Sequence, residues 1–594
     1  MSQPIEDYAV VGDTQTAALV GRDGSIDWLC LPRFDSPAIF AALLGDRHNG
    51  RWQIAPAGEV TKVERRYRDD TLVLETDMYT ADGAIRIVDC MPPRGEAPDI
   101  VRLVQGLHGR VEVEMELLIR FDYGQIVPWV RRHRDYRLAI AGPDAVRLDA
   151  GVETHGENMA TRASFAVQRG DEIPFVLTWY PSHMPEPAPV DAAQAVEDTV
   201  TWWRDWLGPC RVPDPLVRRS VITLKALTYG PTGGVVAAVT TSLPEQLGGV
   251  RNWDYRYCWL RDATLTLNSM LSLGFDDEAR AWRDWLLRAV AGDPRDMQIM
   301  YGPAGERRLT ELELPWLAGY ENSKPVRVGN AASEQFQLDV YGEVMDMLLR
   351  AREEGIEPEA HGWQLQRTVL DFLESDWERP DEGLWEVRGP RRHFVHSKVM
   401  AWVAFDRAVK HVEQFGLPGD ADRWRREREE IHREVCEKGW DAERNTFTQS
   451  YGSQALDAAL LLIPRTGFLP GEDPRVLGTI EAVRRDLDHD GFLLRYPTDE
   501  SDDGLPPGEG AFLPCTFWLA DALAMAGRRD EARALYDRLA GLANDVGLFA
   551  EEYDPKAGRM VGNFPQAFTH LAMVDAAQDL IPHETGPRRR DRPG

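Results

Sequence analysis

Apolar and polar residues alternate with a period of two over much of the first third of the chain, and this is the pattern of β-strands. Alternating or β-branched runs occupy 71–80, 84–90, 100–107 and 111–121, and Gly, Asp and Pro residues separate them. Turn residues between short strands favour antiparallel pairing. The pattern therefore predicts an antiparallel β-sandwich over residues 1–189.

The periodicity changes after the proline-rich stretch 182–189. The segment 188–207 is rich in alanine, poor in β-branched residues and has helical spacing. We interpret residues 190–212 as a linker helix between two domains.

From about Pro213 onward the apolar positions recur with helical spacing. About twelve candidate helices can be counted, near 214–229, 261–274, 276–292, 333–354, 362–375, 395–415, 420–437, 454–464, 474–487, 512–527, 528–544 and 566–580. Short and long connections alternate between them, which favours six helical hairpins closed into an (α/α)6 barrel over residues 213–584. An open α-solenoid is the competing architecture, but no repeat of fixed period supports it. The basic end, 585–594, is predicted to be a disordered tail.

Composition and charge are those of a soluble globular protein with more than one domain: 594 residues, of which 43% are hydrophobic. The formal net charge of −29 argues against nucleic acid as a partner, because phosphate binding depends on clustered Lys and Arg. The sequence shows neither a signal peptide nor 18 uninterrupted apolar residues. We therefore expect a cytoplasmic protein with no membrane partner, and the sequence leaves a homo-oligomer open.

Metal and nucleotide chemistry find no support in the sequence. The six cysteines form no C-x-x-C pair, and His393, His396 and His570 show no H-E-x-x-H pattern. We predict no metal site and no disulfide framework. The chain also has neither a glycine-rich nucleotide loop nor a G-x-S-x-G elbow.

Four loops before predicted helices combine aromatic and charged residues. The first, 251–265, interleaves aromatic rings with fixed charges, which suits a sugar, because C–H faces stack on rings while hydroxyls need donors and acceptors. Its residues are Trp253, Tyr255, Tyr257 and Trp259 with Asp254, Arg256, Arg261 and Asp262. A buried aromatic cluster with a structural Arg–Asp pair explains the same pattern equally well.

The second loop places Glu386 between Trp385 and Val387. An aromatic and apolar neighbourhood can keep a carboxyl protonated near neutral pH, as a general acid requires. A salt bridge with Arg388 or Arg391 is the alternative.

The third loop brings Arg495 and Glu509 ahead of a helix, although an acid there can simply complement the helix N-terminus. The fourth has Glu551 and Glu552 after an apolar run. By itself such a pair is more often a solvated surface feature. Four such loops in one barrel nevertheless indicate a shared site.

The segments "DYRYCWLRD", "GLWE", "LLRYP" with "GEGAFLPCTFW", and "FAEEYDP", in that order, resemble glycoside hydrolase family 15. Residues 5–40 resemble the N-terminal region of its trehalase-like branch, so the resemblance covers nearly the whole chain. It implies an (α/α)6 catalytic barrel behind an N-terminal β-sandwich. It also implies that Glu386 is the general acid and Glu551 the general base. Because adjacent residues in an extended loop point to opposite sides, we expect Glu552 to be an exposed or structurally paired neighbour.

The same resemblance implies a sugar-binding set, to which we add Glu509: Tyr255, Trp259, Arg261, Asp262, Trp385, Arg495 and Glu509. An inverting glycosidase separates its two carboxyls by about 6.5–9.5 Å and needs one protonated and one ionised. We expect Trp385 to raise the pKa of Glu386 and a wetter pocket to keep Glu551 ionised.

The expected activity is hydrolysis of a small saccharide by an inverting, exo-acting α-glucosidase that releases glucose, with α,α-trehalose favoured as substrate. Glucoamylase-type action on malto- or isomalto-oligosaccharides is the alternative. A sugar phosphorylase and a noncatalytic carbohydrate-binding protein are less favoured. No cofactor is predicted; trehalases of this branch can require phosphate and magnesium, but no residues in the sequence can be assigned to either.

Overall fold

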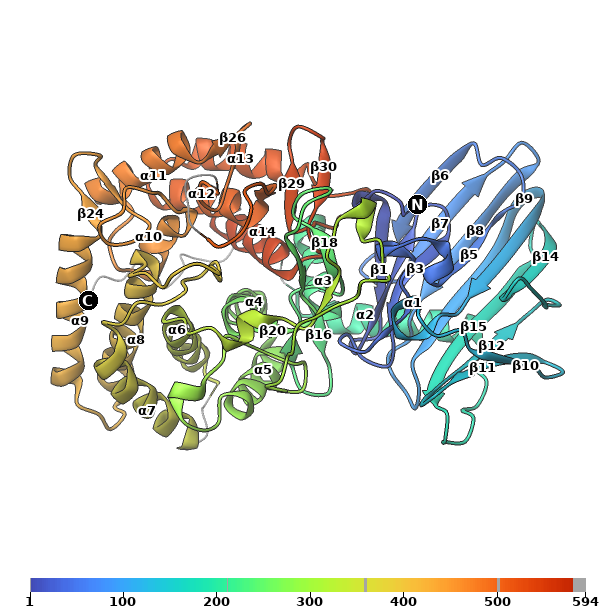
Figure 1. Ribbon diagram of the computed structural model, residues 1–594, viewed down its shortest axis with the longest axis horizontal. Helices are drawn as coiled ribbons and strands as arrows, with labels where there is room; N and C mark the ends of the chain where they lie inside the picture. Colours follow the sequence, from blue (N-terminus) through green and yellow to red (C-terminus); the bar gives the residue numbers. More distant parts are fainter. Residues whose placement is uncertain (1, 211, 357–359, 499–502, 581–594) are drawn as a thin grey trace.

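The computed structural model describes residues 2–210, 212–356, 360–498 and 503–580. A β-rich N-terminal part lies beside a ring of helices, and the two form one elongated molecule (Figure 1). The tail predicted at 585–594 and the last residues of the predicted barrel, 581–584, lie outside the described residues.

Two antiparallel sheets share the long strand β9 (Asp99–Leu118). Its C-terminal half pairs with β5 (Arg51–Pro56) and β14 (Ala160–Gln168), and its N-terminal half pairs with β8 (Gly83–Cys90) and β15 (Glu172–Pro181). The two strands predicted at 100–107 and 111–121 are therefore one strand, because the glycines between them do not end it.

Both sheets contribute to one continuous core, in which Ile54 of β5 and Ile87 of β8 are fully buried. This confirms the predicted antiparallel β domain. The remaining strands extend the two sheets: β1 (Tyr8–Gly12), β2 (Ala17–Gly21), β3 (Ser25–Cys30), β4 (Ala38–Phe40), β6 (Lys62–Tyr67), β7 (Leu74–Tyr79), β10 (Trp129–Arg132), β11 (Tyr136–Ala141), β12 (Asp144–Ala150) and β13 (His155–Glu157).

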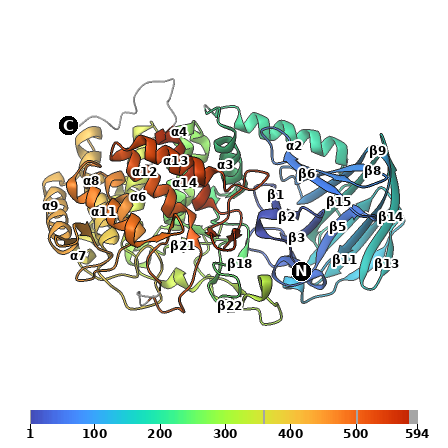
Figure 2. The ribbon, with the colours of Figure 1, turned by 90° about the horizontal axis from the view of Figure 1, so that it is seen from above.

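Helix α2 (Ala192–Leu207) runs along the β domain toward the helical part (Figure 2). Asp191 caps it by accepting a hydrogen bond from the Gln194 N–H. Its apolar face, which includes Val196 and Val200, packs on Val88 and neighbouring residues of the sheet. At its C-terminal end the Trp206 ring stacks on Phe275, with centroids 4.7 Å apart.

Six inner elements pack in a closed ring, and six outer helices surround them among the described residues. The inner elements are α4 (Leu260–Leu273), α6 (Asp339–Glu353), α8 (Val395–Phe415), the short pair η7 and α10 (Ala458–Leu462 and Ile463–Thr466), α12 (Leu513–Met525) and α14 (Ala567–Leu580). The outer helices are α3 (Pro215–Ala226), α5 (Asp276–Ala289), α7 (Ala360–Asp376), α9 (Ala421–Lys438), α11 (Pro474–Asp486) and α13 (Arg529–Ala540). The predicted (α/α)6 barrel is confirmed.

The distribution of apolar residues in each helix explains which helices form the inner ring of the barrel. Every residue of α12 from Leu513 to Leu523 is buried, whereas α9 buries only Trp424, Ile431 and Val435 and exposes a charged face. Within the described part of the chain, none of the helices combines the length and the apolar character needed to cross a lipid bilayer.

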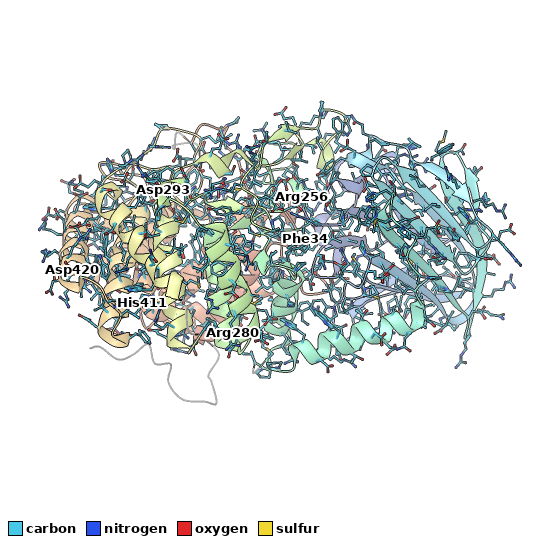
Figure 3. The ribbon with its side chains drawn as sticks, turned by 90° about the horizontal axis from the view of Figure 1, so that it is seen from below. Phe34, Arg256, Arg280, Asp293, His411 and Asp420 are labelled. Atoms are coloured by element: carbon cyan, nitrogen blue, oxygen red, sulfur yellow. The ribbon has the colours of Figure 1, made fainter. Side chains whose placement is uncertain are left out.

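The β domain reaches the barrel through residues 28–36, which contact the segment before α4. The Trp28 indole donates a hydrogen bond to the Val239 carbonyl at 2.8 Å. Arg256 is fully buried at this junction and donates to the carbonyls of Phe34 and Ser36 (Figure 3). The N-terminal domain thus supports the loop that carries Tyr255 and Trp259.

Candidate active site

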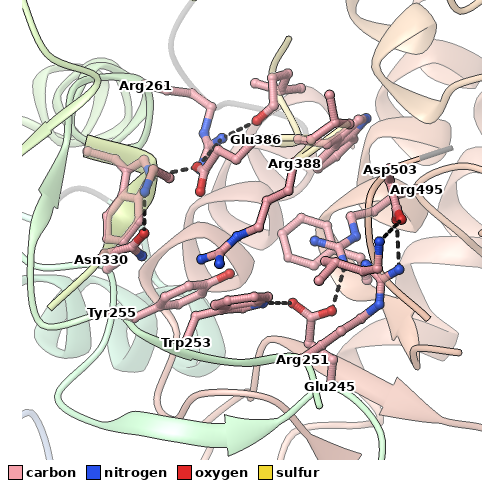
Figure 4. A pocket seen from close by; sticks show the side chains of 18 of the residues that line it. Glu245, Arg251, Trp253, Tyr255, Arg261, Asn330, Glu386, Arg388, Arg495 and Asp503 are labelled. Atoms are coloured by element: carbon pink, nitrogen blue, oxygen red, sulfur yellow. Dashed lines mark hydrogen bonds and ion pairs between the residues drawn. The ribbon is translucent and has the colours of Figure 1, made fainter. Parts of the chain in front are cut away.

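A cavity lies at the end of the barrel where the inner helices begin. Its lining comes from the loops or first turns of α4, α6, α8, α12 and α14 (Figure 4). All four predicted loops therefore contribute, but the fourth supplies Gln566 and neither Glu551 nor Glu552. The N-termini of helices carry partial positive charge, which favours carboxylates and sugar oxygens at this end.

Glu386 lines this cavity beside Trp259. The Trp259 indole N–H donates to Glu386 Oε1 at 2.7 Å, and Arg261 Nη1 lies 3.7 Å from the same oxygen. Burial raises the pKa of Glu386, while Arg261 and the indole hydrogen bond oppose the shift. Burial rather than Trp385 is therefore the main cause of the raised pKa that the sequence predicted.

The backbone at Glu386 is held in an unusual conformation. Its φ is +58°, in the left-handed region that non-glycine residues seldom occupy, and its N–H donates to the Gly383 carbonyl at 3.1 Å. Such conformations cost about 1–3 kcal/mol and persist where the surroundings fix them, often at functional sites. The turn directs this carboxyl toward the cavity rather than toward Arg391, which pairs with Glu382.

Glu551 lies on the other side of the aromatic wall. The Tyr255 hydroxyl donates to Glu551 Oε1 at 2.6 Å, and the Asn563 N–H donates to Oε2 at 3.0 Å. Tyr255 lines the cavity, but Glu551 does not and is 0% exposed. The expected wetter environment is therefore wrong for this structure: burial and the nearby charge of Glu245 raise the pKa of Glu551.

A glycine makes room for the Glu551 carboxylate. Gly562 has a φ of +78°, and a Cβ placed there would lie 2.6 Å from both Cβ and Oε2 of Glu551. Any larger residue would displace this side chain.

Glu552 is also 0% exposed. Of the two predicted alternatives the exposed position is therefore wrong and the structurally paired one agrees with the structure, whereas the view of the two acids as a surface feature is wrong. The reason is strand β29 (Glu552–Asp554), which lies between β28 (Ala511–Phe512) and β30 (Arg559–Val561) and buries this residue. Its closest cation is Arg495, whose Nη2 lies 3.6 Å from Oε1. Burial raises the pKa of Glu552 well above its usual value.

Arg261 and Asp262 line the cavity as a fixed pair at the start of α4. Arg261 Nε donates to Asp262 Oδ1 at 2.6 Å, and Nη1 donates to the Leu384 carbonyl at 2.8 Å. Trp385 also lines the cavity, and its indole donates to Asp457 Oδ1 at 2.8 Å. Each of these groups is held by protein contacts before any ligand arrives.

Arg495 lines the cavity, but Glu509 does not. Glu509 Oε2 lies 2.5 Å from Arg495 Nη2, and Glu245 Oε2 lies 2.8 Å from the same nitrogen. Oxygens of Glu245, Glu509 and Glu552 come within 4.8 Å of one another, which is a spacing that could hold a cation. The Arg495 guanidinium already supplies a positive charge to these carboxylates.

Several cavity residues had no distinct signal in the sequence. Glu245 stands alone between Pro244 and Gln246, yet its Oε1 accepts from the Trp253 indole at 3.1 Å. Asn330 and Asp503 also line the cavity. Alternation along 253–256 was the one usable sign, because Trp253 and Tyr255 line the cavity while Asp254 and Arg256 do not, and Arg256 donates to the Ser36 carbonyl of the N-terminal domain.

Comparison with known proteins places these features in a family. The model of glycosyl hydrolases family 15 matches residues 214–578, and that of a trehalase-like N-terminal region matches residues 1–181.

Two relatives align with nearly the whole chain. The trehalase of Mycobacterium tuberculosis is 39% identical over 613 residues, covering 97% of this chain and 90% of the relative. The trehalase of Mycolicibacterium smegmatis is 40% identical over 614 residues, covering 97% and 91%.

A solved structure shares the fold. A bacterial glucoamylase in complex with acarbose superposes with a TM-score of 0.72 at 13% identity, covering 97% of this chain and 94% of that one. Because the family model spans more than half of the chain and both relatives align over nearly all of it, the chain belongs to glycoside hydrolase family 15.

Proposed function

We propose that this glycoside hydrolase cleaves α,α-trehalose into two glucose molecules, with inversion at the attacked carbon. The relatives named trehalase support the choice of substrate. One observation carries the proposed mechanism: neighbouring aromatic residues in the cavity wall hold two separate carboxyls, Trp259 holding Glu386 and Tyr255 holding Glu551.

Glu386 acts as the general acid in this proposal. Burial raises its pKa, which favours the protonated form that a general acid needs. Because the Trp259 N–H donates to Oε1, the acidic proton resides on Oε2. Transfer of this proton to the glycosidic oxygen lets the C–O bond break, and the departing glucose keeps that oxygen as its hydroxyl.

Glu551 acts as the general base in its ionised form and reaches the cavity through Tyr255. Burial raises the pKa of Glu551 to about 8, so this form predominates above that pH, and the hydrogen bonds from Tyr255 and the Asn563 N–H favour it. Water attacks the anomeric carbon from the face opposite the departing glucose. As it does so, the Tyr255 hydroxyl passes its own proton to Glu551 Oε1 and takes up the proton of the water. No free phenolate forms, which matters because burial raises the pKa of Tyr255 well above its usual value.

The sugar that is attacked binds to Arg261, Asp262 and Arg495, which line the cavity and are already fixed by their partners. The arginines can donate hydrogen bonds to sugar hydroxyls, and the Asp262 carboxylate has the sign that favours positive charge on the ring and needs no rearrangement as this charge develops. Glu509 and Glu552 act indirectly, because both lie next to Arg495 rather than in the cavity lining.

The test is incubation with trehalose, maltose, isomaltose and soluble starch, with and without phosphate, reading free glucose and glucose 1-phosphate. We expect free glucose from trehalose. Inversion predicts equal initial amounts of α- and β-glucose by NMR, since the attacked residue becomes β and the departing residue stays α. Preference for maltose or starch would indicate a glucoamylase, glucose 1-phosphate a phosphorylase, and α-glucose alone would exclude inversion.

A further inference from the structure

Arg388 lies two residues after the proposed acid and lines the same cavity. Its backbone N–H donates to the Asp503 carbonyl at 2.8 Å, which fixes the loop before α8 against the loop before α12. In Figure 4 its side chain extends between Glu386 on one side and Trp253 and Tyr255 on the other. The sequence had suggested only that it could form a salt bridge with Glu386.

The guanidinium has different partners. It lies 4.2 Å from the centroid of the Trp253 ring, and its Nη2 lies 2.8 Å from Glu311 Oε2. Arginine has five N–H donors in a rigid fork, and the contacts with Glu311 engage two of its nitrogens. Arg388 can therefore donate to a ligand without losing this ion pair.

Side-chain exposure orders the charged cavity residues by depth. The exposed fraction is 9% for Arg495, 12% for Arg261, 21% for Glu386 and 31% for Arg388. Of these four side chains, Arg261 and Arg495 are the most enclosed, Glu386 is intermediate, and Arg388 is the most accessible to solvent, which places it toward the mouth. An acid midway in the cavity protonates a bond whose other sugar lies toward the mouth, next to Arg388.

We infer that Arg388 is a specificity-determining residue, which binds the departing glucose of a disaccharide and blocks the path of a third sugar. This inference rests on the proposed function. A longer α-glucan would have to pass the guanidinium, which Trp253 and Glu311 hold across the mouth. Trehalose ends at its second glucose and needs no such passage.

The chain offers a matched control in Arg327. Its guanidinium lies 4.6 Å from the centroid of the same Trp253 ring, and its Nε lies 3.5 Å from the same residue, Glu311. Arg327 does not line the cavity. Replacing Arg327 removes a cation that contacts Trp253 and Glu311, but it does not widen the mouth of the cavity.

The experiment measures kcat/KM for trehalose, maltose and maltotriose with three variants of the full chain. Arg388→Ala should raise the ratio of maltotriose to trehalose at least tenfold, through a higher KM for trehalose together with a higher kcat/KM for maltotriose. Arg388→Met keeps the length but has no donors, so it should raise the KM for trehalose while still excluding maltotriose. Arg327→Ala should leave the ratio within twofold of wild type.

The outcomes separate this inference from the proposed function. An unchanged ratio in Arg388→Ala, or an equal change in Arg327→Ala, would overturn the role of Arg388 alone, provided that the wild-type protein cleaves trehalose. A wild-type protein that releases glucose from none of these sugars would overturn the proposed function and this inference with it. Thermal melting of each variant identifies any loss that comes from misfolding.

Discussion

Tyr255 and Trp259 pack edge to face with ring centroids 5.2 Å apart, and each donates a hydrogen bond to a different one of the two proposed catalytic carboxyls. Edge-to-face packing restricts both rings, so the Tyr255 hydroxyl and the Trp259 indole N–H keep a fixed position relative to each other. The distance between acid and base is thus set by one loop, residues 251–259, rather than by the two glutamates' own loops alone.

Replacing Trp259 with Phe should move only the alkaline limb of the pH dependence of kcat/KM. The indole N–H stabilises the ionised form of Glu386 and so lowers its pKa. Without it the acid stays protonated to higher pH, and the alkaline limb moves to higher pH.

Tyr255→Phe is the matched variant. It removes the donor to Glu551, so the acid limb moves to higher pH and kcat falls about 10²-fold. Identical shifts in both variants would refute separate roles.

Sequence periodicity predicted the two domains and the barrel because both depend on local patterns. Each expected helix from 214–229 to 566–580 has a counterpart, although the one at 454–464 is a 3₁₀ turn followed by the four-residue α10. Asp457 caps this turn, and Pro464 lies in the first turn of the short helix, which begins at Ile463. A period of 3.6 does not distinguish such a turn from a full helix over so few residues.

Site residues could be predicted where the motif is contiguous, and not where the fold assembles it. Trp385 and Glu386 are neighbours in the sequence, whereas Glu245 meets Arg495 only because the strand β18 (Thr241–Pro244) ends beside the loop before α12. The burial of Glu552 depends on pairing with Phe512 and Val561 across a three-stranded sheet. Such long-range pairing leaves no mark on the local sequence.

We expect Arg256 to hold the active-site loop, residues 251–259, in place through its contacts with the N-terminal domain. It pairs with Asp254 at 2.6 Å, and Asp254 also accepts from the Gly329 N–H at 3.0 Å. Because both charges are buried, Arg256→Ala should cost about 3–5 kcal/mol of stability. We also expect kcat/KM to fall at least tenfold per folded molecule, with partial rescue in Arg256→Lys.

Arg218 provides the control for this experiment. It forms a partly exposed pair with Asp70 at 2.7 Å, which also joins the two domains but lies outside the cavity lining. Arg218→Ala should change stability by no more than about 1 kcal/mol and leave kcat unchanged. If Arg218→Ala and Arg256→Ala lower kcat equally, the loss comes from weakened association of the two domains and not from a specific role of Arg256. Circular dichroism melting and active-site kinetics supply the two measurements.

Alanine substitutions at Gly562 and Gly558 test whether the Glu551 side chain needs the space that Gly562 leaves for it. Both have positive φ, +78° and +67°, so alanine is strained at either, at a cost of about 1–2 kcal/mol. Only at Gly562 would the new Cβ meet Glu551; at Gly558 the nearest atom is the Tyr553 hydroxyl at 3.9 Å. Gly562→Ala should therefore lose most activity, whereas Gly558→Ala should lose stability alone. Equal activity in the two folded variants would contradict the tight packing around Glu551.

Chemical rescue should assign the roles of the adjacent acids. Glu551→Ala removes the proposed base and should be nearly inactive toward trehalose, with a loss of about 10²–10⁴-fold in kcat. Azide needs no deprotonation, and α-glucosyl fluoride needs no acid to release fluoride, so azide should displace fluoride in this variant to form β-glucosyl azide. Glu552→Ala removes a carboxyl that contacts Arg495 but not the cavity, so it should retain more activity and gain nothing from azide. Formation of the azide product in Glu552→Ala instead would exchange the roles. If neither variant loses activity, neither glutamate is the base.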